Sequence, residues 1–433
     1  MSPCQGCDSY QRMTRRQWLC SAIGAAGGAT FLGLLDPRIL YAAPRKKKPD
    51  RAQSVILLWM GGGMSHLDTL DPQPGSEFGG PFEGIKTTAD GVVISQHLPR
   101  IAKQFKHLSL IRSMTSNEFD HDRATYLMHT GYQVLPSMKH STLGSITAKY
   151  LGPSPRDANL PPYVSIGIDW AAGYLGPKFA PYYVGAAERA NENLVVPQGV
   201  GERRFNDRLK LLSEFDRSFR AKYPRHPVLE GFAEHYNAAL LMMRPRTAKV
   251  FDLDDEPDVV RAAYGETSGF GQGCLLARRL VQSGVRFIEV ALPGWDTHQD
   301  NFETVKAKSG ELDMAVSTLI EDLRAKDLWD QTVVILTSEF GRTPSINGNL
   351  GRDHWPRVWS TAIGGGGLVA GQVIGASDQG REVADRPIRV GELHATICQA
   401  LDIDWTRSNK SPDGRPFRVV NDHAAAPIAE LFA

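Results

Sequence analysis

The chain has almost no net charge, few cysteines outside its N-terminal segment, and no nucleotide-binding motif. Its 49 basic and 48 acidic side chains leave a formal charge of +1. This balance excludes a global field that would hold nucleic acid or an anionic membrane, so any anion site must be local. Beyond the first 43 residues only Cys274 and Cys398 remain, which excludes a disulfide framework and is typical of small buried side chains.

Three further patterns are absent. No glycine-rich loop is followed by Lys-Ser or Lys-Thr at P-loop spacing, and no G-x-G-x-x-G opens a helix after the first predicted strand, which argues against nucleotide and dinucleotide sites. No solenoid period is visible. What is present is a globular composition, with 42% hydrophobic and 22% charged residues. The chain is long enough for one large α/β domain or for two ordinary ones.

The N-terminus resembles a twin-arginine export signal. Arg15 and Arg16 precede an apolar stretch from Leu19 to Leu35 that is rich in glycine and alanine. Tyr41–Ala43 offers small residues for cleavage. We therefore predict a signal peptide over residues 1–43 and a basic linker over 44–53, with the mature protein in the periplasm or outside the cell. The alternative is an uncleaved membrane anchor, although about 17 residues is at the lower limit for a span.

The remaining residues, 54–433, show the alternation of strands and helices that is typical of α/β proteins. Continuous apolar runs predict buried strands over 54–60, 285–292 and 332–337. Apolar residues three and four apart predict helices over 273–283, 312–323 and 390–401. This order implies parallel strands joined by right-handed crossovers. The range 150–250 is rich in proline and aromatic residues and then helical, and we interpret it as an insertion on the main sheet.

Polar residues that can bind a metal ion follow the predicted strands. In open α/β sheets, function gathers beyond the carboxyl ends of the strands. Imidazole and carboxylate together suit zinc, manganese or iron, and carboxylates alone suit magnesium or calcium. We therefore expect one shared site that binds divalent metal ions (zinc, manganese, magnesium or calcium). The sequence does not fix the number of ions. The candidate ligands from these segments are Asp296, His298, Glu339, Asp353 and His354.

The glycines at 61–63, directly after the first strand, leave two interpretations open. Their backbone N–H groups could approach an anion, as in a nest, or they could form a tight turn.

Together with the leader, three motifs resemble a large exported bacterial family that is catalogued as a domain of unknown function. These motifs are Gly62–Thr69, Ser338–Pro344 and Gly351–Pro356. The family is placed among alkaline-phosphatase-like and sulfatase-like proteins, and the resemblance covers essentially the whole body. It implies a mostly parallel central sheet sandwiched between helices, and a site of one or two metal ions that hydrolyses or transfers phosphate and sulfate esters.

The chain departs from that pattern at three positions. The end of the first strand normally gives a metal-binding aspartate, but Gly61–Gly63 stand there, with Ser65, His66 and Asp68 slightly later. Sulfatases carry a nucleophile modified to formylglycine ahead of a helix that Arg123–Tyr132 resembles, but Phe119 stands where the nucleophile would be. This excludes a standard formylglycine sulfatase. The usual Ser-Asp-His-Gly appears as Ser338–Gly341 and keeps a carboxylate without the imidazole.

The leading hypothesis is an exported metal-dependent hydrolase. Ser65 is a candidate nucleophile, and His66 or His121 a candidate general acid or base, because imidazole titrates near neutral pH. Arg342 and Arg352 are candidates for holding substrate oxygens by forked hydrogen bonds. The alternative is a non-catalytic exported protein with a degenerate sulfatase-like fold that binds a glycan, a sulfated polymer or a protein.

The expected partners follow from these hypotheses. They are a small-molecule or polysaccharide ester as substrate and the twin-arginine translocation machinery during export. No nucleic acid is expected, and a membrane only if the leader is not cleaved.

Overall fold

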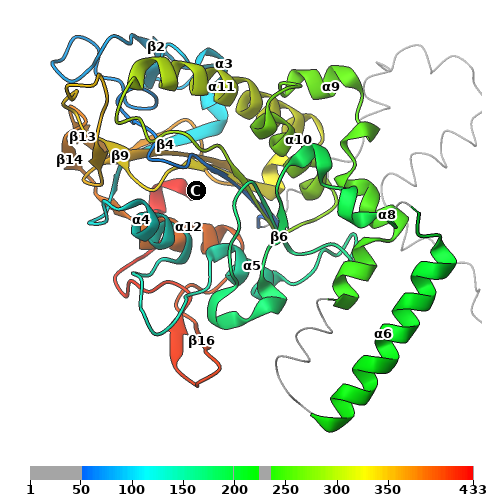
Figure 1. Ribbon diagram of the computed structural model, residues 1–433. Helices are drawn as coiled ribbons and strands as arrows, with labels where there is room; N and C mark the ends of the chain where they lie inside the picture. Colours follow the sequence, from blue (N-terminus) through cyan, green and yellow to red (C-terminus); the bar gives the residue numbers. More distant parts are fainter. Residues whose placement is uncertain (1–50, 198, 224–235, 433) are drawn as a thin grey trace, which may run out of the picture. The chain divides into compact units, whose positions relative to one another are not determined.

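A nine-stranded sheet lies at the centre of the chain (Figure 1). The computed structural model describes residues 51–432 except residue 198 and residues 224–235. The strands lie in the order β12-β4-β11-β8-β1-β7-β5-β6, and β15 pairs with β4. Their bounds are Ser54–Trp59 (β1), Leu108–Thr115 (β4), Tyr163–Ile166 (β5), Tyr182–Val184 (β6), Phe287–Ala291 (β7), Thr332–Thr337 (β8), Trp359–Gly365 (β11), Val373–Ile374 (β12) and Ile388–Arg389 (β15).

The sheet is mostly parallel. β1 pairs in parallel with β7 on one side and β8 on the other, and β5 pairs in parallel with β7 and β6. β11 is antiparallel to both β8 and β4, so β4 again runs in the direction of β8. The carboxyl ends of β1, β4, β7 and β8 therefore meet at the same edge of the sheet, where function is expected in such folds.

Helices cover both faces of the sheet, because the buried side chains of the central strands alternate. Ile56 and Leu58 of β1 join a core with the helices α3, α10 and α11, whereas Val55 and Trp59 join a second core with α4, α5 and α12. Figure 1 shows these two groups on opposite sides of the strands. The bounds are Pro99–Gln104 (α3), His121–Thr130 (α4), Leu143–Leu151 (α5), Gly269–Gln282 (α10), Asn301–Ala325 (α11) and Val390–Ala400 (α12).

Shorter elements complete the described chain. The other helices are α6 (Glu202–Lys222), α8 (Pro245–Ala248) and α9 (Asp258–Ala263). Four two-stranded pairs join β2 (Gly84–Lys86) to β3 (Val93–Ser95), β9 (Gly341–Arg342) to β10 (His354–Trp355), β13 (Ala376–Asp378) to β14 (Glu382–Asp385), and β16 (Ser408–Lys410) to β17 (Pro416–Arg418).

The predicted fold class, α/β with a mostly parallel sheet between helices, is confirmed by this topology. Within the range predicted as an insertion, 150–250, the strands β5 and β6 belong to the main sheet. In the chain, α6 follows β6 and precedes α8. The predicted leader and residues 44–50 of the predicted linker lie outside the described residues. Cys274 and Cys398 are free and buried.

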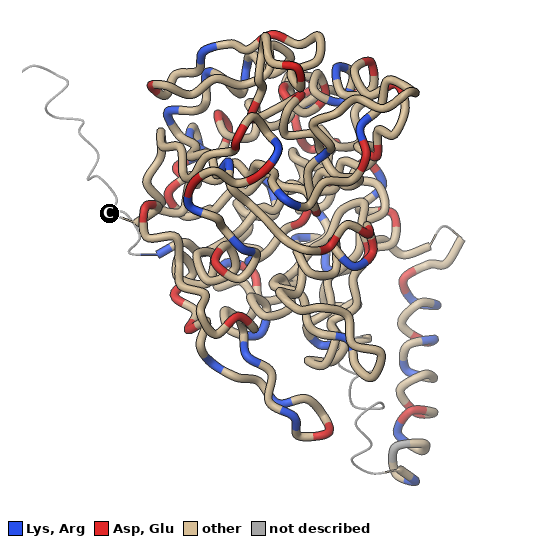
Figure 2. The backbone as a smooth tube through the Cα atoms, turned by 90° about the vertical axis from the view of Figure 1, so that its left-hand side faces the viewer, with Lys and Arg blue, Asp and Glu red and all other residues tan. Residues whose placement is uncertain are grey.

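Charges of both signs are interspersed along the described backbone (Figure 2), as the near-zero net charge predicts. None of the helices in the described ranges combines the length and the apolar character that a membrane crossing requires.

His394 makes the second core sensitive to acid. Its Nε2 atom lies 2.8 Å from the carbonyl oxygen of Met128 in α4, and burial lowers its pKa to about 4. The unfolded chain therefore takes up a proton near pH 6.5 that the folded chain resists, so stability falls as the pH drops through this window. Between pH 7 and 4.5 we expect wild type to lose about 2–3 kcal/mol more unfolding free energy than His394→Gln, which retains a donor for Met128. Urea denaturation at both pH values measures this, and equal losses would contradict it.

Candidate metal centre

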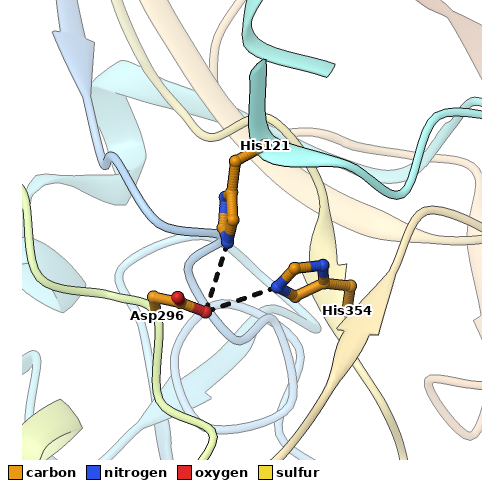
Figure 3. Close-up of side chains that lie close together, drawn as sticks. All are labelled: His121, Asp296 and His354. Carbon is orange, nitrogen blue, oxygen red and sulfur yellow. Dashed lines mark hydrogen bonds and ion pairs between the residues drawn. The ribbon is translucent and has the colours of Figure 1, made fainter. Parts of the chain in front are cut away.

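Three side chains from distant parts of the sequence point toward one another at the carboxyl edge of the sheet (Figure 3). His121 is the first residue of α4, Asp296 lies in the loop after β7, and His354 opens β10. Each offers one ligand atom, and these atoms all lie within 4.8 Å of one another. Asp120 caps α4 by accepting a hydrogen bond from the backbone of Arg123, which fixes the start of the helix beside the loop.

The imidazole nitrogens converge on one carboxylate oxygen, Oδ1 of Asp296. The Nε2 atoms of His121 and His354 lie 3.2 and 3.4 Å from it. The Nε2 atom of His298 lies 3.1 Å from the same oxygen and 2.9 Å from Nε2 of His354. The structure thus brings together three histidines and one aspartate that the sequence places in three separate segments.

The opposite ring nitrogen of each histidine faces an oxygen acceptor. Carbonyl and ionised carboxylate oxygens only accept, so each Nδ1 carries the proton and leaves Nε2 free to bind a cation. Such outer partners are typical of metal-binding histidines. The three contacts, each 2.7 Å long, are His121 to Glu339, His298 to Asp353, and His354 to the carbonyl of Phe119.

Glu339 and the neighbouring glycines form the support for His121. Glu339 is buried, and its Oε1 atom also accepts a hydrogen bond from the backbone of Gly62. Gly62 has a φ of 111°, and a side chain there would meet the backbone nitrogen of Asp296 at 2.5 Å. The glycines after the first strand therefore form a tight turn that holds Glu339 and admits the Asp296 loop, rather than a nest for an external anion.

Phe340 packs against two of the imidazoles. Its ring centroid lies 4.9 Å from that of His121 and 4.8 Å from that of His354, and the side chain is fully buried. Phe340 thus forms a wall of the cluster and restricts the rotation of both rings.

The protonation states suit a cation. Burial acts to raise the pKa of Asp296, but the hydrogen bond and charge of Arg342, together with His121, hold it at about 2. Burial lowers the pKa of His354, and the charge of Arg342 adds to this. The hydrogen bond to Glu339 raises the pKa of His121. The acidic surroundings of His121 therefore favour positive charge at its Nε2 atom, whether from a proton or from a metal ion.

The two arginines predicted to hold substrate are both fully buried. Arg342 donates to Asp296 and to the carbonyl oxygens of Gly62 and Gly63. Arg352 donates to the carboxylate of Asp68 and to backbone oxygens. Both guanidinium groups therefore lie in the protein interior and not at the open side of the cluster.

Ser65 and His66 also lie in the interior, and the contacts made by their side chains do not reach the cluster. The hydroxyl of Ser65 donates to Asp68 over 2.5 Å, and His66 Nε2 lies 2.9 Å from the carbonyl oxygen of Gly380. Both side chains are at most 1% exposed, so neither is placed to meet a substrate.

From its sequence context His121 is a candidate for proton transfer and not for metal binding, but the structure places it among the ligands. A signal for the grouping was present: residues 108–115 form β4, whose carboxyl end reaches the same edge of the sheet six residues before His121. Polar residues interrupt this segment, whereas the central strands are continuous apolar runs, so it is not among the predicted strands. Glu339 and Asp353, predicted as ligands, contact the histidines through Nδ1 instead.

These features define an α/β protein with a histidine-rich candidate metal centre at the carboxyl edge of a mostly parallel sheet. The chain belongs to the family described as "Protein of unknown function (DUF1501)", whose model matches residues 52–432. A search of curated proteins found no match.

Solved structures resemble the chain at low identity. A sulfatase from Pseudoalteromonas is 13% identical, with 82% of this chain and 68% of that chain covered and a TM-score of 0.39. A protein in the alkaline phosphatase superfamily from Vibrio parahaemolyticus is 11% identical, with 82% of this chain and 67% of that chain covered and a TM-score of 0.38. The C-terminal periplasmic domain of EcEptC from Escherichia coli, in complex with zinc, is 10% identical, with 89% of this chain and 97% of that chain covered and a TM-score of 0.38. At such scores these structures carry no conclusion about the site of this chain.

Proposed function

We propose that the protein is an exported, metal-dependent hydrolase that acts on phosphate or sulfate esters, with His121, Asp296 and His354 as the metal ligands. The observation that supports the metal ion is the convergence of two imidazole nitrogens and one carboxylate oxygen, each the far atom of a side chain that is held from behind. The Nε2 atoms of His121 and His354 lie 3.2 and 3.4 Å from Oδ1 of Asp296, and the three ligand atoms all lie within 4.8 Å of one another. Positive charge is favoured among these atoms, and a metal ion would bind all three of them at once.

The residues fit a transition metal. Two imidazole nitrogens and one carboxylate oxygen are the kind of set that zinc takes in catalytic sites, which keep a fourth position open for water. Magnesium and calcium prefer oxygen ligands, so within the predicted metals this set favours zinc or manganese. Three carboxylates, those of Asp296, Glu339 and Asp353, contact the histidines, and one guanidinium, that of Arg342, contacts Asp296. A divalent cation suits this acidic setting.

Each residue has a defined part in the proposed reaction. A bound metal ion would polarise the ester and lower the pKa of a water molecule in the open position. Glu339 and the carbonyl of Phe119 hold the two ligand imidazoles in the tautomer that leaves Nε2 free. The side chain of His298 is 44% exposed and is oriented by Asp353, so its Nε2 atom is placed to take up or release a proton on the open side.

The substrate class and the compartment come from the sequence. The motif resemblance points to phosphate or sulfate esters, on small molecules or polysaccharides, and the twin-arginine pattern points to export into the periplasm or beyond.

A non-catalytic binding protein is the second candidate. It is supported by the burial of Ser65, Arg342 and Arg352, which leaves the cluster without the predicted side-chain nucleophile and without the predicted arginine contacts to substrate.

The test is a screen of aryl phosphate and aryl sulfate esters with purified wild-type protein, before and after chelation and after return of zinc or manganese. We expect hydrolysis that chelation abolishes and metal restores. The matched control, His423→Ala, removes an exposed histidine on the loop after β17 and should behave as wild type. Stoichiometric metal without hydrolysis of any ester would favour the binding protein, and absence of metal would contradict both the centre and the hydrolase.

A further inference from the structure

Behind the candidate metal centre lies a fully buried carboxylate, Asp68, that contacts none of the three proposed ligands. Its Oδ2 atom accepts hydrogen bonds from the hydroxyl of Ser65 at 2.5 Å, from the side-chain amide of Asn301 at 2.9 Å and from Nε of Arg352 at 2.8 Å. All four side chains are completely buried. A buried charge with this number of donors is costly to assemble, and such networks fix the geometry of what surrounds them.

The donors come from the loops that carry the cluster. Arg352 directly precedes Asp353 and His354. Asn301 opens α11, and its side-chain oxygen accepts a hydrogen bond of 2.6 Å from the hydroxyl of Thr297, the residue between Asp296 and His298. Through these contacts one carboxylate connects the loop after β1 with the loop after β7 and with the loop between β9 and β10.

The same two ligand loops are also joined through their backbones. The amide of Arg352 donates to the carbonyl of Thr297 at 2.9 Å, and the amide of Asn301 donates to that of Leu350 at 3.0 Å. At Gly351 the loops approach so closely that a Cβ atom would lie 1.9 Å from the carbonyl oxygen of His298. Because the two loops are in direct backbone contact, a small displacement of the Asp68 side chain would move both of them.

We infer that Asp68 is the positioning residue of the metal centre: it fastens the loop of Asp296 and His298 to the loop of Asp353 and His354, and thereby sets the distance between the ligands. This inference rests on the proposed function. It also gives Ser65 and Arg352 a role, as donors to Asp68 rather than as nucleophile and substrate-binding residue.

The test uses Co²⁺ as a probe, because its visible absorption reports the number and geometry of ligands independently of activity. In Asp68→Asn an amide N–H₂ group replaces one acceptor oxygen and faces donors. Outer partners of metal ligands change affinity by about 10–100-fold, so we expect Co²⁺ to bind roughly 10–100-fold more weakly, with an altered absorption spectrum. Ser65→Ala and Thr297→Val each remove a single hydroxyl, and we expect about 3–10-fold weaker binding from each.

The matched control is Asp313→Asn. Asp313 is also a buried carboxylate, 5% exposed, and it joins α11 to α3 by accepting from the backbones of Arg100 and Ile101. It should lose stability while its Co²⁺ affinity and spectrum remain those of wild type. Should Asp68→Asn fail to fold, the two hydroxyl variants decide the question.

Wild-type affinity and spectrum in Ser65→Ala and Thr297→Val, or in a folded Asp68→Asn, would overturn the positioning role and leave the proposed function intact. Failure of the wild-type protein itself to bind Co²⁺ would overturn both.

Discussion

Replacing His121 with alanine is expected to weaken metal binding strongly, whereas replacing His298 with alanine is expected to keep the metal affinity and slow hydrolysis. Structural zinc sites are worth about 10–16 kcal/mol, so the loss of one of the three protein ligands costs about 3–5 kcal/mol, on the order of 1,000-fold in affinity. His298 lies at the open side, held by Asp353, and its loss removes a proton-transfer group, an effect of roughly 10²–10⁴-fold on rate. Zinc affinity by chelator competition and the rate of ester hydrolysis separate the two effects.

The control for both variants is His423→Ala, which should match wild type in metal content and rate. The assignment of roles would be contradicted if His121→Ala retained zinc with wild-type affinity. It would also be contradicted if His298→Ala lost the metal as completely as His121→Ala, because His298 would then be a ligand.

The second large effect is expected at Glu339. In the structure this carboxylate orients His121 from behind, through Nδ1, although the sequence suggested direct metal binding. Glutamine can still accept from His121 and Gly62 but lacks the charge, so Glu339→Gln should weaken zinc binding about 10–100-fold. If Glu339 bound the metal directly, its replacement would weaken zinc binding as much as the replacement of His121 does. The measurement is the same chelator competition on both variants side by side.

Glu289 offers a matched control. It is another buried glutamate that contacts a histidine, with its Oε1 atom 2.7 Å from Nε2 of His129. Because His129 lies about two turns along α4 from His121, Glu289→Gln should reduce stability and leave zinc affinity within about threefold of wild type. If both glutamine variants weakened zinc binding equally, the effect of Glu339 would be one of general stability, and its orienting role would be wrong.

The sequence was informative about the sheet because periodicity and burial are local properties. The runs at 54–60, 285–292 and 332–337 contain the strands β1, β7 and β8, and short continuous apolar runs bounded by turn residues are typical of strands covered on both faces. Their order predicted that the following segments would meet, and the structure brings Asp296 and His354 within 3.4 Å.

The division of roles within the site could not be predicted in the same way. Whether Arg352 faces a substrate or Asp68 depends on contacts across 284 residues of sequence, and whether Glu339 or His121 meets a metal depends on which ring nitrogen faces the carboxylate. Neither leaves a trace in spacing or composition. Charged side chains are usually exposed. A sequence pattern therefore predicts an exposed arginine even where the fold buries it completely.

The most direct test of the account is X-ray diffraction from crystals of the purified protein soaked with zinc, with data collected on both sides of the zinc absorption edge. The account predicts an anomalous difference peak within about 2.0–2.2 Å of Nε2 of His121, Nε2 of His354 and a carboxylate oxygen of Asp296. A map that shows well-ordered side chains at these positions and no anomalous peak between them would contradict it.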